Sequence, residues 1–363
     1  MEDYYQQKIR KTAHHLPGQG KVSWSSPSNI ALVKYWGKHD MQLPDNASLS
    51  MTLNHARSLV EMAFTRQSSG SLEVDFTFDG NPDHHFGKRI MEFFTLIKPW
   101  FPFLDELALS IHSKNTFPHS AGIASSASFM SALSLCVLSL ERFEDQVYDE
   151  SFYQKASWLS RLGSGSASRS VFPRLAAWGE HPFVDNSSDY YARNMDTVLH
   201  SEIAGLKDAV VVVNASPKKV SSSEGHALMN GHFYAENRIQ QASSNMARLL
   251  DALYQNNWPV ITEVVENEAL SLHAMMLSSL PGYTLLQQET ISVIERVRKY
   301  RADKKMDICF TLDAGPNVHV LYRARDSVVV KQFIESQLKP LAEDQMVIYD
   351  EMGEGPVLLE KNG

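Results

Sequence analysis

A glycine- and serine-rich loop that opens onto a long run of small and apolar residues constrains the fold more than any other feature of this chain. The segment reads FPHSAGIASSASFMSALSLCVLSLERF and spans residues 117–143. So few charges over such a length predict a helix that is buried on most of its sides. A helix start can bind phosphate through its N–H groups and dipole; Gly122 permits close approach, and the hydroxyls of Ser125 and Ser126 can reach phosphate or magnesium. A capped core helix, with small residues that serve packing, is the alternative.

The rest of the chain keeps strand patterns and helix patterns largely apart. Residues 58–65 and 71–78 alternate around the turn RQSSG and predict a hairpin, while long helical patterns cover roughly 226–256, 259–279 and 284–302. This segregation favours an α+β fold. The loop at the start of the buried helix matches neither the Walker A pattern nor the dinucleotide fingerprint, which argues against those two folds.

The length of 363 residues predicts about two domains. A polar start that ends in LPGQG predicts a flexible extension over residues 1–20. The apolar, β-branched strand DAVVVVNAS follows a polar and aspartate-rich stretch at 181–205. We therefore place a domain boundary just before this strand and divide the chain into residues 21–207 and 208–363.

Charge and hydropathy exclude several classes of partner. The formal net charge of −8 gives no general attraction to nucleic acid or to an anionic membrane, so we expect neither as a partner. The N-terminal residues lack the apolar stretch of a signal peptide, and no segment approaches the ~20 apolar residues that span a bilayer. We expect a cytoplasmic location, with Cys136 and Cys309 as buried, reduced thiols inside apolar runs.

A second glycine–serine segment, GSGSASRS at residues 163–170, carries an arginine close to its end. Small residues bring a backbone near a ligand, and the planar fork of Arg169 suits a carboxylate or a phosphate. The alternative is a flexible turn with a solvated arginine.

Two lysines and a tyrosine lie within five residues of one another in NIALVKYWGKHD, residues 29–40. Lys34, Tyr35 and Lys38 can clamp a diphosphate and would form a local positive site in an acidic protein. Surface lysines beside core aromatic residues are the alternative. In SPKKVSSSEG, residues 216–225, two further lysines and a serine row directly follow a strand, and exposed turn lysines are the commoner explanation of such a pattern.

An aspartate stands where an apolar strand ends in the turn LDAGPN, residues 312–317. Asp313 is either an ordinary turn residue or a base that faces a phosphate-rich cleft. The 14 histidines show no HExxH spacing and the chain has no GxSxG, so a zinc protease and an α/β-hydrolase lose support.

Taken in order, five blocks resemble the diphosphomevalonate decarboxylase family of the GHMP kinase superfamily over roughly residues 22–325. They read SxSNIALVKYWGK, PHSAGIASSAS, GSGSASRS, KKVSSSEG and LDAGPN. KYWGK and GSGSASRS are typical of this branch, whereas the sugar kinases of the superfamily share mainly the glycine–serine loop. The resemblance implies a two-lobed GHMP kinase fold with the active site in the interlobe cleft, an ATP-binding N-terminal lobe, ATP with Mg²⁺ as cofactors, and a homodimer.

The resemblance also implies a role for each matching residue. The base of the family falls on Asp313, the arginine beside the mevalonyl carboxylate on Arg169, and a lysine near the base on Lys34. The implied substrate-binding residues are Tyr35, Lys38, Ser164, Ser166 and Ser222. The implied nucleotide-binding residues are Ala121, Gly122, Ser125 and Ser126, of which Ser126 also serves the metal.

The implied reaction is ATP-dependent decarboxylation of mevalonate 5-diphosphate to isopentenyl diphosphate, with phosphorylation of the tertiary hydroxyl on the way. Ser223 stands where many bacterial relatives carry an arginine. These relatives carry a second arginine soon after the following glycine, where this chain reads GHALMNGH. This departure leaves room for mevalonate 5-phosphate as substrate and isopentenyl phosphate as product. A mevalonate 3-kinase and an inert GHMP-fold binding protein are further alternatives. His119 and Ser120 replace the usual Thr-Ala of the phosphate loop, a change that we expect to be tolerated.

Overall fold

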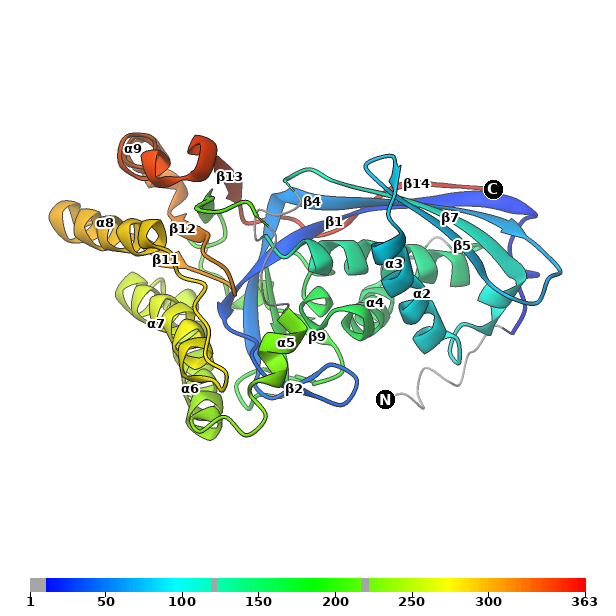
Figure 1. Cartoon of the computed structure of the whole chain (residues 1–363), viewed down its shortest axis with the longest axis horizontal. Helices are drawn as coiled ribbons and strands as arrows, with labels where there is room; N and C mark the ends of the chain where they lie inside the picture. The colour runs from blue at the N-terminus through cyan, green and yellow to red at the C-terminus, as the bar shows by residue number, and fades with distance from the viewer. Residues whose placement is uncertain (1–10, 119–122, 146, 217–221) are drawn as a thin grey trace.

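The computed structural model describes residues 11–118, 123–145, 147–216 and 222–363. They form two lobes, each built on its own sheet. Figure 1 shows the larger sheet with helices against one of its faces, and a smaller, helix-rich lobe beside it. Helices and largely antiparallel strands in one molecule confirm the predicted α+β class.

The first lobe is built on an eight-stranded sheet. Its main path runs through β14 (Val357–Asn362), β1 (Gln19–Val33), β4 (Ser48–Arg66), β7 (Leu107–Asn115), β5 (Glu73–Phe78) and β6 (Asn81–Pro82); β8 (Leu175–Trp178) pairs with β4, and β9 (Ala192–Asn194) with β8. β2 (Lys38–His39) and β3 (Leu43–Pro44) form a separate ribbon. Burial alternates along the second half of β4, because one face of the sheet packs on helices and the other is more open.

Two pairings in this sheet differ from the sequence predictions. The predicted hairpin of residues 58–65 and 71–78 is wrong, because β7 lies between β4 and β5, antiparallel to the first and parallel to the second. A local turn signal carries no information about a strand inserted from later in the chain. β14, which belongs to the predicted second domain of residues 208–363, also pairs with β1 of the first lobe. The division near residue 208 otherwise stays a proposal.

One helix runs through the interior of the first lobe. The helices of this lobe are α2 (His84–Ile97), α3 (Ser125–Glu141), α4 (Glu150–Gly163), and the short 3-10 helices η1 (Pro102–Glu106), η2 (Gly165–Ser168) and η3 (Asp196–Val198). Every residue of α3 from Ala127 onward is buried, which confirms the predicted buried helix. Two of its buried serines form hydrogen bonds to the sheet: Ser131 bonds to Ser26 at 2.6 Å, and Ser128 to Ser58 at 2.7 Å.

The second lobe packs helices against a four-stranded sheet. The strand order is β11 (Ile308–Thr311), β12 (Val318–Tyr322), β10 (Lys207–Val211) and β13 (Val347–Glu351). The helices are α5 (Ser222–Ala227), α6 (Ala235–Gln255), α7 (Trp258–Ser278), α8 (Gln288–Lys304) and α9 (Ser327–Phe333). The shorter turns after β12 are η4 (Ala324–Asp326), η5 (Ile334–Leu338), η6 (Lys339–Leu341) and η7 (Glu343–Gln345).

A shared apolar core joins the two lobes. Leu32 of β1 and Met51 of β4 belong to the same buried cluster as Leu249 of α6 and Val265 of α7. The long strands therefore carry their ends into contact with the second lobe, and the segment that follows β1 begins at the junction. Cys136 and Cys309 are buried and free, as predicted. Within the described ranges, no helix combines the length and the apolar character that crossing a membrane requires.

Candidate active site

A lysine from the first lobe and an aspartate from the second meet at this junction. Lys34 directly follows β1 and is 1% exposed, and its Nζ lies 2.9 Å from Oδ1 of Asp313 and 2.6 Å from the carbonyl oxygen of Ala31. Burial lowers the pKa of Lys34, and attraction to Asp313 opposes this shift. Asp313 stands in the turn after β11, where Gly315 N donates to its carbonyl oxygen at 2.7 Å. The two lobes thus contribute one member each to a shielded ion pair.

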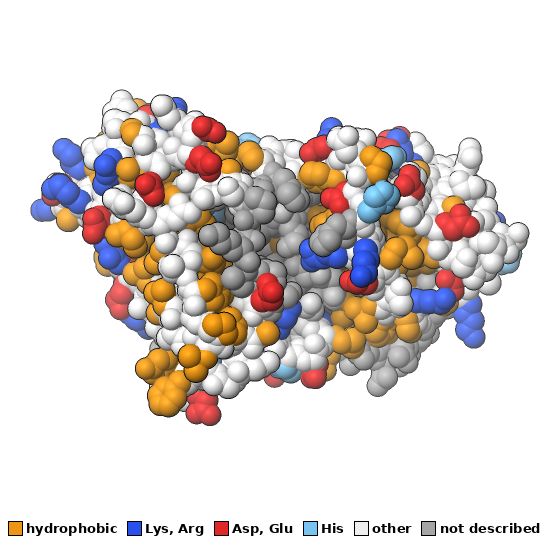
Figure 2. Space-filling view, in the orientation of Figure 1, with side chains coloured by type: hydrophobic (Ala, Val, Ile, Leu, Met, Phe, Trp, Pro, Cys, Tyr) orange, Lys and Arg blue, Asp and Glu red, His pale blue; other side chains and the backbone are white. Residues whose placement is uncertain are grey.

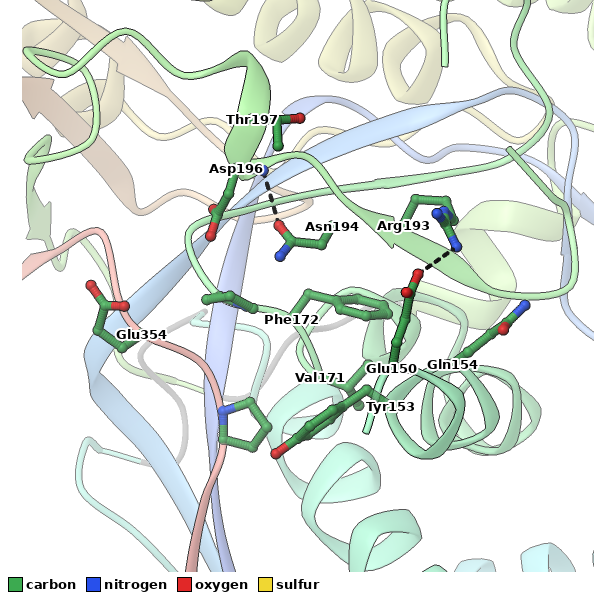
Figure 3. Close-up of a pocket in the computed structure, with 12 residues that line it drawn as sticks. Glu150, Tyr153, Gln154, Val171, Phe172, Arg193, Asn194, Asp196, Thr197 and Glu354 are labelled. Carbon is green, nitrogen blue, oxygen red and sulfur yellow. Dashed lines mark hydrogen bonds and ion pairs between the residues drawn. The ribbon is translucent and has the colours of Figure 1, made fainter. Parts of the chain in front are cut away.

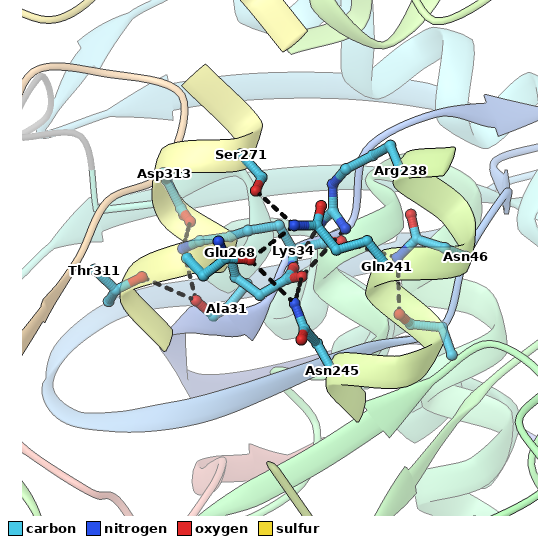
Figure 4. A network of polar contacts seen from close by, with 12 residues as sticks. Ala31, Lys34, Asn46, Arg238, Gln241, Asn245, Glu268, Ser271, Thr311 and Asp313 are labelled. Atoms are coloured by element: carbon cyan, nitrogen blue, oxygen red, sulfur yellow. Dashed lines mark hydrogen bonds and ion pairs between the residues drawn. The ribbon is translucent and has the colours of Figure 1, made fainter. Parts of the chain in front are cut away.

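A buried polar network from the second lobe fixes the backbone of Lys34 (Figure 4). Glu268 of α7 is fully buried, and its Oε2 accepts from the N–H of Lys34 at 2.8 Å. Both Nη atoms of Arg238 donate to the same carboxylate, at 3.1 and 2.6 Å, and Asn245 donates to it at 2.7 Å. On the other side, Asn46 donates to the carbonyl oxygen of Lys34 at 2.9 Å. Because the buried charge of Glu268 is well matched, the network fixes the position of the lysine.

The sequence analysis did not predict this network, because it identified helical patterns at 226–256 and 259–279 and assigned no role to Glu268 or Arg238. A signal was nevertheless present, because Glu268 and Arg238 interrupt helical patterns at positions that the structure buries. A charge on the buried side of a helix normally requires a partner of opposite charge.

Arg169 is almost fully enclosed beside the first-lobe sheet. It follows η2, is 2% exposed, and donates from Nη1 to the hydroxyl of Ser48. Its guanidinium carbon lies 5.7 Å from the ring centroid of Trp178. Burial lowers the pKa of Arg169 to about 10, against the attraction of Asp313 and Tyr35, so the side chain stays cationic at neutral pH. Its Nε has no hydrogen-bond partner in the part of the chain that the structure describes.

Tyr35 places a phenol in the same space. Burial raises the pKa of Tyr35, so its hydroxyl remains a donor at physiological pH. Among the described residues this hydroxyl also has no hydrogen-bond partner. A Cβ atom at Gly165 would lie only 2.8 Å from it, so the glycine is required for the close approach. Two buried and unmatched donors, this hydroxyl and Nε of Arg169, are what a site for an anionic ligand requires.

The other predicted substrate residues belong to β2, to the segment from the end of α4 through η2, and to the start of α5. Lys38 of β2 is half-buried, burial lowers its pKa, and its Nζ contacts Oε1 of Gln42 at 2.8 Å. Ser164 caps the end of α4, and Ser166 lies in η2. Ser222 begins α5, but its side chain lies outside the described part of the structure.

The predicted phosphate loop is described only in part. Ala121 and Gly122 lie outside the described residues, whereas Ser125 and Ser126 form the first turn of α3. Ala124, just before the helix, has a φ of 31°, a left-handed conformation that is rare for residues other than glycine. Across the described ranges no group of three or more His, Cys, Asp or Glu residues could hold a metal. A magnesium ion here would take its ligands from phosphates and from a hydroxyl such as that of Ser126.

A cavity of about 530 Å³ lies elsewhere in the first lobe (Figure 3). It opens between α4, β9 and the loop after Arg169, and Glu150 and Arg193 form an ion pair of 3.2 Å at its wall. None of the predicted site residues lines it. The candidate site therefore rests on the polar geometry at the lobe junction.

The class of protein is a GHMP kinase fold. Its features here are the buried helix α3 and the lysine–aspartate pair where the two α+β lobes meet. Within this class, the chain belongs to the diphosphomevalonate decarboxylase family. A model of the diphosphomevalonate decarboxylase-like N-terminal domain matches residues 26–190, and a model of the mevalonate 5-diphosphate decarboxylase C-terminal domain matches residues 209–359.

Individual relatives agree with this assignment over nearly the whole chain. The diphosphomevalonate decarboxylase of Aspergillus fumigatus is 30% identical, over 89% of this chain and 82% of its own length. The solved mevalonate diphosphate decarboxylase from Staphylococcus aureus is 27% identical and superposes with a TM-score of 0.81, over 94% of this chain and 98% of that one. A structure of MDDEF in complex with MVAPP, AMPPCP and magnesium is 26% identical, with a TM-score of 0.80 and coverage of 94% and 99%.

Proposed function

We propose that this protein catalyses the ATP-dependent decarboxylation of mevalonate 5-diphosphate to isopentenyl diphosphate, with release of ADP, phosphate and carbon dioxide. The single observation that carries the proposal is the ion pair of Lys34 and Asp313, 2.9 Å apart, at the lobe junction that also holds the buried cation of Arg169. The names of its relatives and the ligands of the MDDEF complex support the same reaction.

The first step turns a poor leaving group into a good one. Asp313 accepts or orients the proton of the tertiary hydroxyl, whose oxygen attacks the γ-phosphorus of ATP as ADP leaves. Lys34 holds the carboxylate of Asp313 in place. Magnesium, when bound, neutralises charge on the transferring phosphoryl group, and the start of α3 with Ser125 and Ser126 is the segment that would hold the phosphates.

The second step breaks two σ bonds and forms two π bonds, one in the alkene and one in carbon dioxide. Phosphate leaves carbon 3 with the electrons of its C–O bond. The electrons of the bond to the carboxylate then form the alkene as carbon dioxide departs. Arg169 binds this carboxylate in a fixed orientation, a contact that requires its charge but no proton transfer. Tyr35, Lys38, Ser164, Ser166 and Ser222 are the residues that we assign to the rest of the substrate.

One assay separates this reaction from its rivals. Purified protein is mixed with ATP–Mg²⁺ and with mevalonate, its 5-phosphate or its 5-diphosphate, and ADP and carbon dioxide are measured separately. We expect both products with the 5-diphosphate. Preference for the 5-phosphate would favour the alternative that Ser223 raises, ADP alone would indicate a 3-kinase, and neither product would indicate an inert binding protein. We also propose a homodimer, from the family resemblance alone, which light scattering tests.

A further inference from the structure

A histidine of the second lobe contacts two aromatic rings of the first. His226 lies on α5 and is 7% exposed. Its ring centroid is 4.3 Å from that of Tyr35 and 4.7 Å from that of Trp36. A Cβ atom at Gly225 would lie 2.5 Å from Trp36, so α5 is packed tightly against this segment. The imidazole therefore has a fixed position beside the candidate substrate residues.

The contacts of the ring decide which nitrogen carries the proton. The N–H of Gly37 donates to Nδ1 of His226 at 3.0 Å, so Nδ1 is an acceptor. Burial, followed by the charges of Lys38 and Arg169, lowers the pKa of His226 to about 3, so the ring is neutral at physiological pH. A neutral imidazole that accepts at Nδ1 carries its hydrogen on Nε2. Within the described ranges this Nε2–H has no hydrogen-bond partner.

The surroundings of His226 offer donors and positive charge. Lys38 and Arg169 lie near enough for their charges to act on the imidazole. The hydroxyl of Tyr35, whose tilted ring contacts the imidazole, is a buried donor without a partner among the described residues. The carboxylate of Asp45, close to Gly37, is already bonded to His39 at 2.8 Å. Several hydrogen-bond donors around one space favour the binding of an anion that has several acceptor oxygens.

We propose that His226 binds the phosphorylated end of the substrate, with Nε2–H donating to a diphosphate oxygen beside Lys38. This inference rests on the proposed function for its substrate. In this arrangement His226 of the second lobe is a neutral donor to the diphosphate, and Tyr35 and Lys38 of the first lobe contact the same diphosphate. Binding of the diphosphate then also holds the lobes together at α5.

A matched pair of substitutions tests the role of Nε2. The side chain of glutamine can place an N–H near the position of Nε2, whereas that of asparagine reaches only to the position of Nδ1. Both variants lose the imidazole ring and its aromatic contacts, so a merely structural role predicts the same effect in both. We expect His226→Gln to keep KM for mevalonate 5-diphosphate within about threefold and His226→Asn to raise it about tenfold or more, the loss expected for one hydrogen bond to a charged group. KM for ATP and kcat should change little in either.

A binding measurement keeps this test independent of the reaction. Inorganic diphosphate is titrated calorimetrically into the wild-type protein and both variants, and thermal unfolding confirms that each is folded. The proposal predicts weaker binding by His226→Asn than by His226→Gln, and a shift of the Nε2–H resonance of the wild type when diphosphate is added. Equal affinities in the two variants, or an unchanged resonance, would overturn it. A wild type that binds diphosphate but is inactive with every mevalonate phosphate would instead refute the proposed function.

Discussion

Lys34 and Asp313 are separated by 279 positions in the chain, yet their side chains form an ion pair of 2.9 Å. Lys34 is held at its N–H by Glu268 of α7, while the carbonyl oxygen of Asp313 lies 3.1 Å from Nε2 of His273 on the same helix. One helix of the second lobe thus fixes the backbone of both partners. On the face of the molecule shown in Figure 2, acidic and basic side chains are interspersed over both lobes.

Removal of the Tyr35 hydroxyl should weaken substrate binding and leave the stability of the fold nearly unchanged. For Tyr35→Phe we expect the free energy of unfolding to stay within about 1 kcal/mol of the wild type, because the hydroxyl makes no hydrogen bond to any residue that the structure describes. KM for the mevalonate substrate should rise about tenfold, because the hydroxyl then no longer donates to it. Urea unfolding and steady-state kinetics measure the two quantities. Tyr254→Phe, at an exposed position, is the control and should change neither.

Replacement of the buried arginine by lysine should reduce decarboxylation strongly. In Arg169→Lys the planar fork is lost, and the same burial that lowers the pKa of Arg169 would favour a neutral amine. We expect carbon dioxide release to fall about 100-fold, with KM for ATP within a few fold. Arg248→Lys, which alters an exposed pair with Glu263, should leave the rate unchanged. Carbon dioxide release at the normal rate would show that the guanidinium does not hold the carboxylate.

The buried network behind Lys34 should contribute to stability. Glu268→Gln leaves the cation of Arg238 buried without its counter-charge, and we expect a loss of about 3 kcal/mol in the free energy of unfolding. Glu263→Gln removes an exposed partner and should cost less than about 1 kcal/mol. Urea unfolding of the two variants measures both values. Equal, small losses would mean that the network is not required for the fold.

His226 should make stability depend on pH. Its pKa of about 3 in the folded protein lies below the ordinary value of 6.5, so the unfolded chain binds more protons between these values. Stability is therefore fully present above about pH 6.5 and falls as the pH decreases toward 3. When the pH falls from 7.5 to 5.5, the stability that His226 contributes decreases by about 1.4 kcal/mol. Urea unfolding at both pH values should show a loss that is smaller by about this amount in His226→Gln, and an equal loss in both proteins would contradict the assignment.

The sequence was sufficient for features that depend on neighbours along the chain. The buried helix α3 follows from the scarcity of charge between Ala127 and Leu140, and the two-lobed family from the order of five motifs. The predicted hairpin failed because the pairing of β4 depends on β7, which arrives about forty residues later. Nothing in the local pattern of β4 distinguishes one neighbouring strand from another.

The site was predictable only where a residue belongs to a motif. The structure places Lys34, Asp313, Arg169 and Tyr35 near one another, while their catalytic roles stay predictions. His226 was not predicted, because its partner Gly37 is 189 positions away. Glu268 was missed for the same reason, with 234 positions between it and Lys34. The significance of such residues depends on burial and partners that only the folded chain supplies.

A comparison of the wild type with Asp313→Asn tests the central claim most directly. Both proteins react with ATP–Mg²⁺ and mevalonate 5-diphosphate while ADP and carbon dioxide are followed separately. The wild type should release the two products in equal amounts, and the variant should release both at least ~100-fold more slowly while it still binds ATP. Asp303→Asn, at an exposed pair with Lys299, should behave like the wild type. Near-normal carbon dioxide release by Asp313→Asn would contradict the assignment of Asp313 as the base.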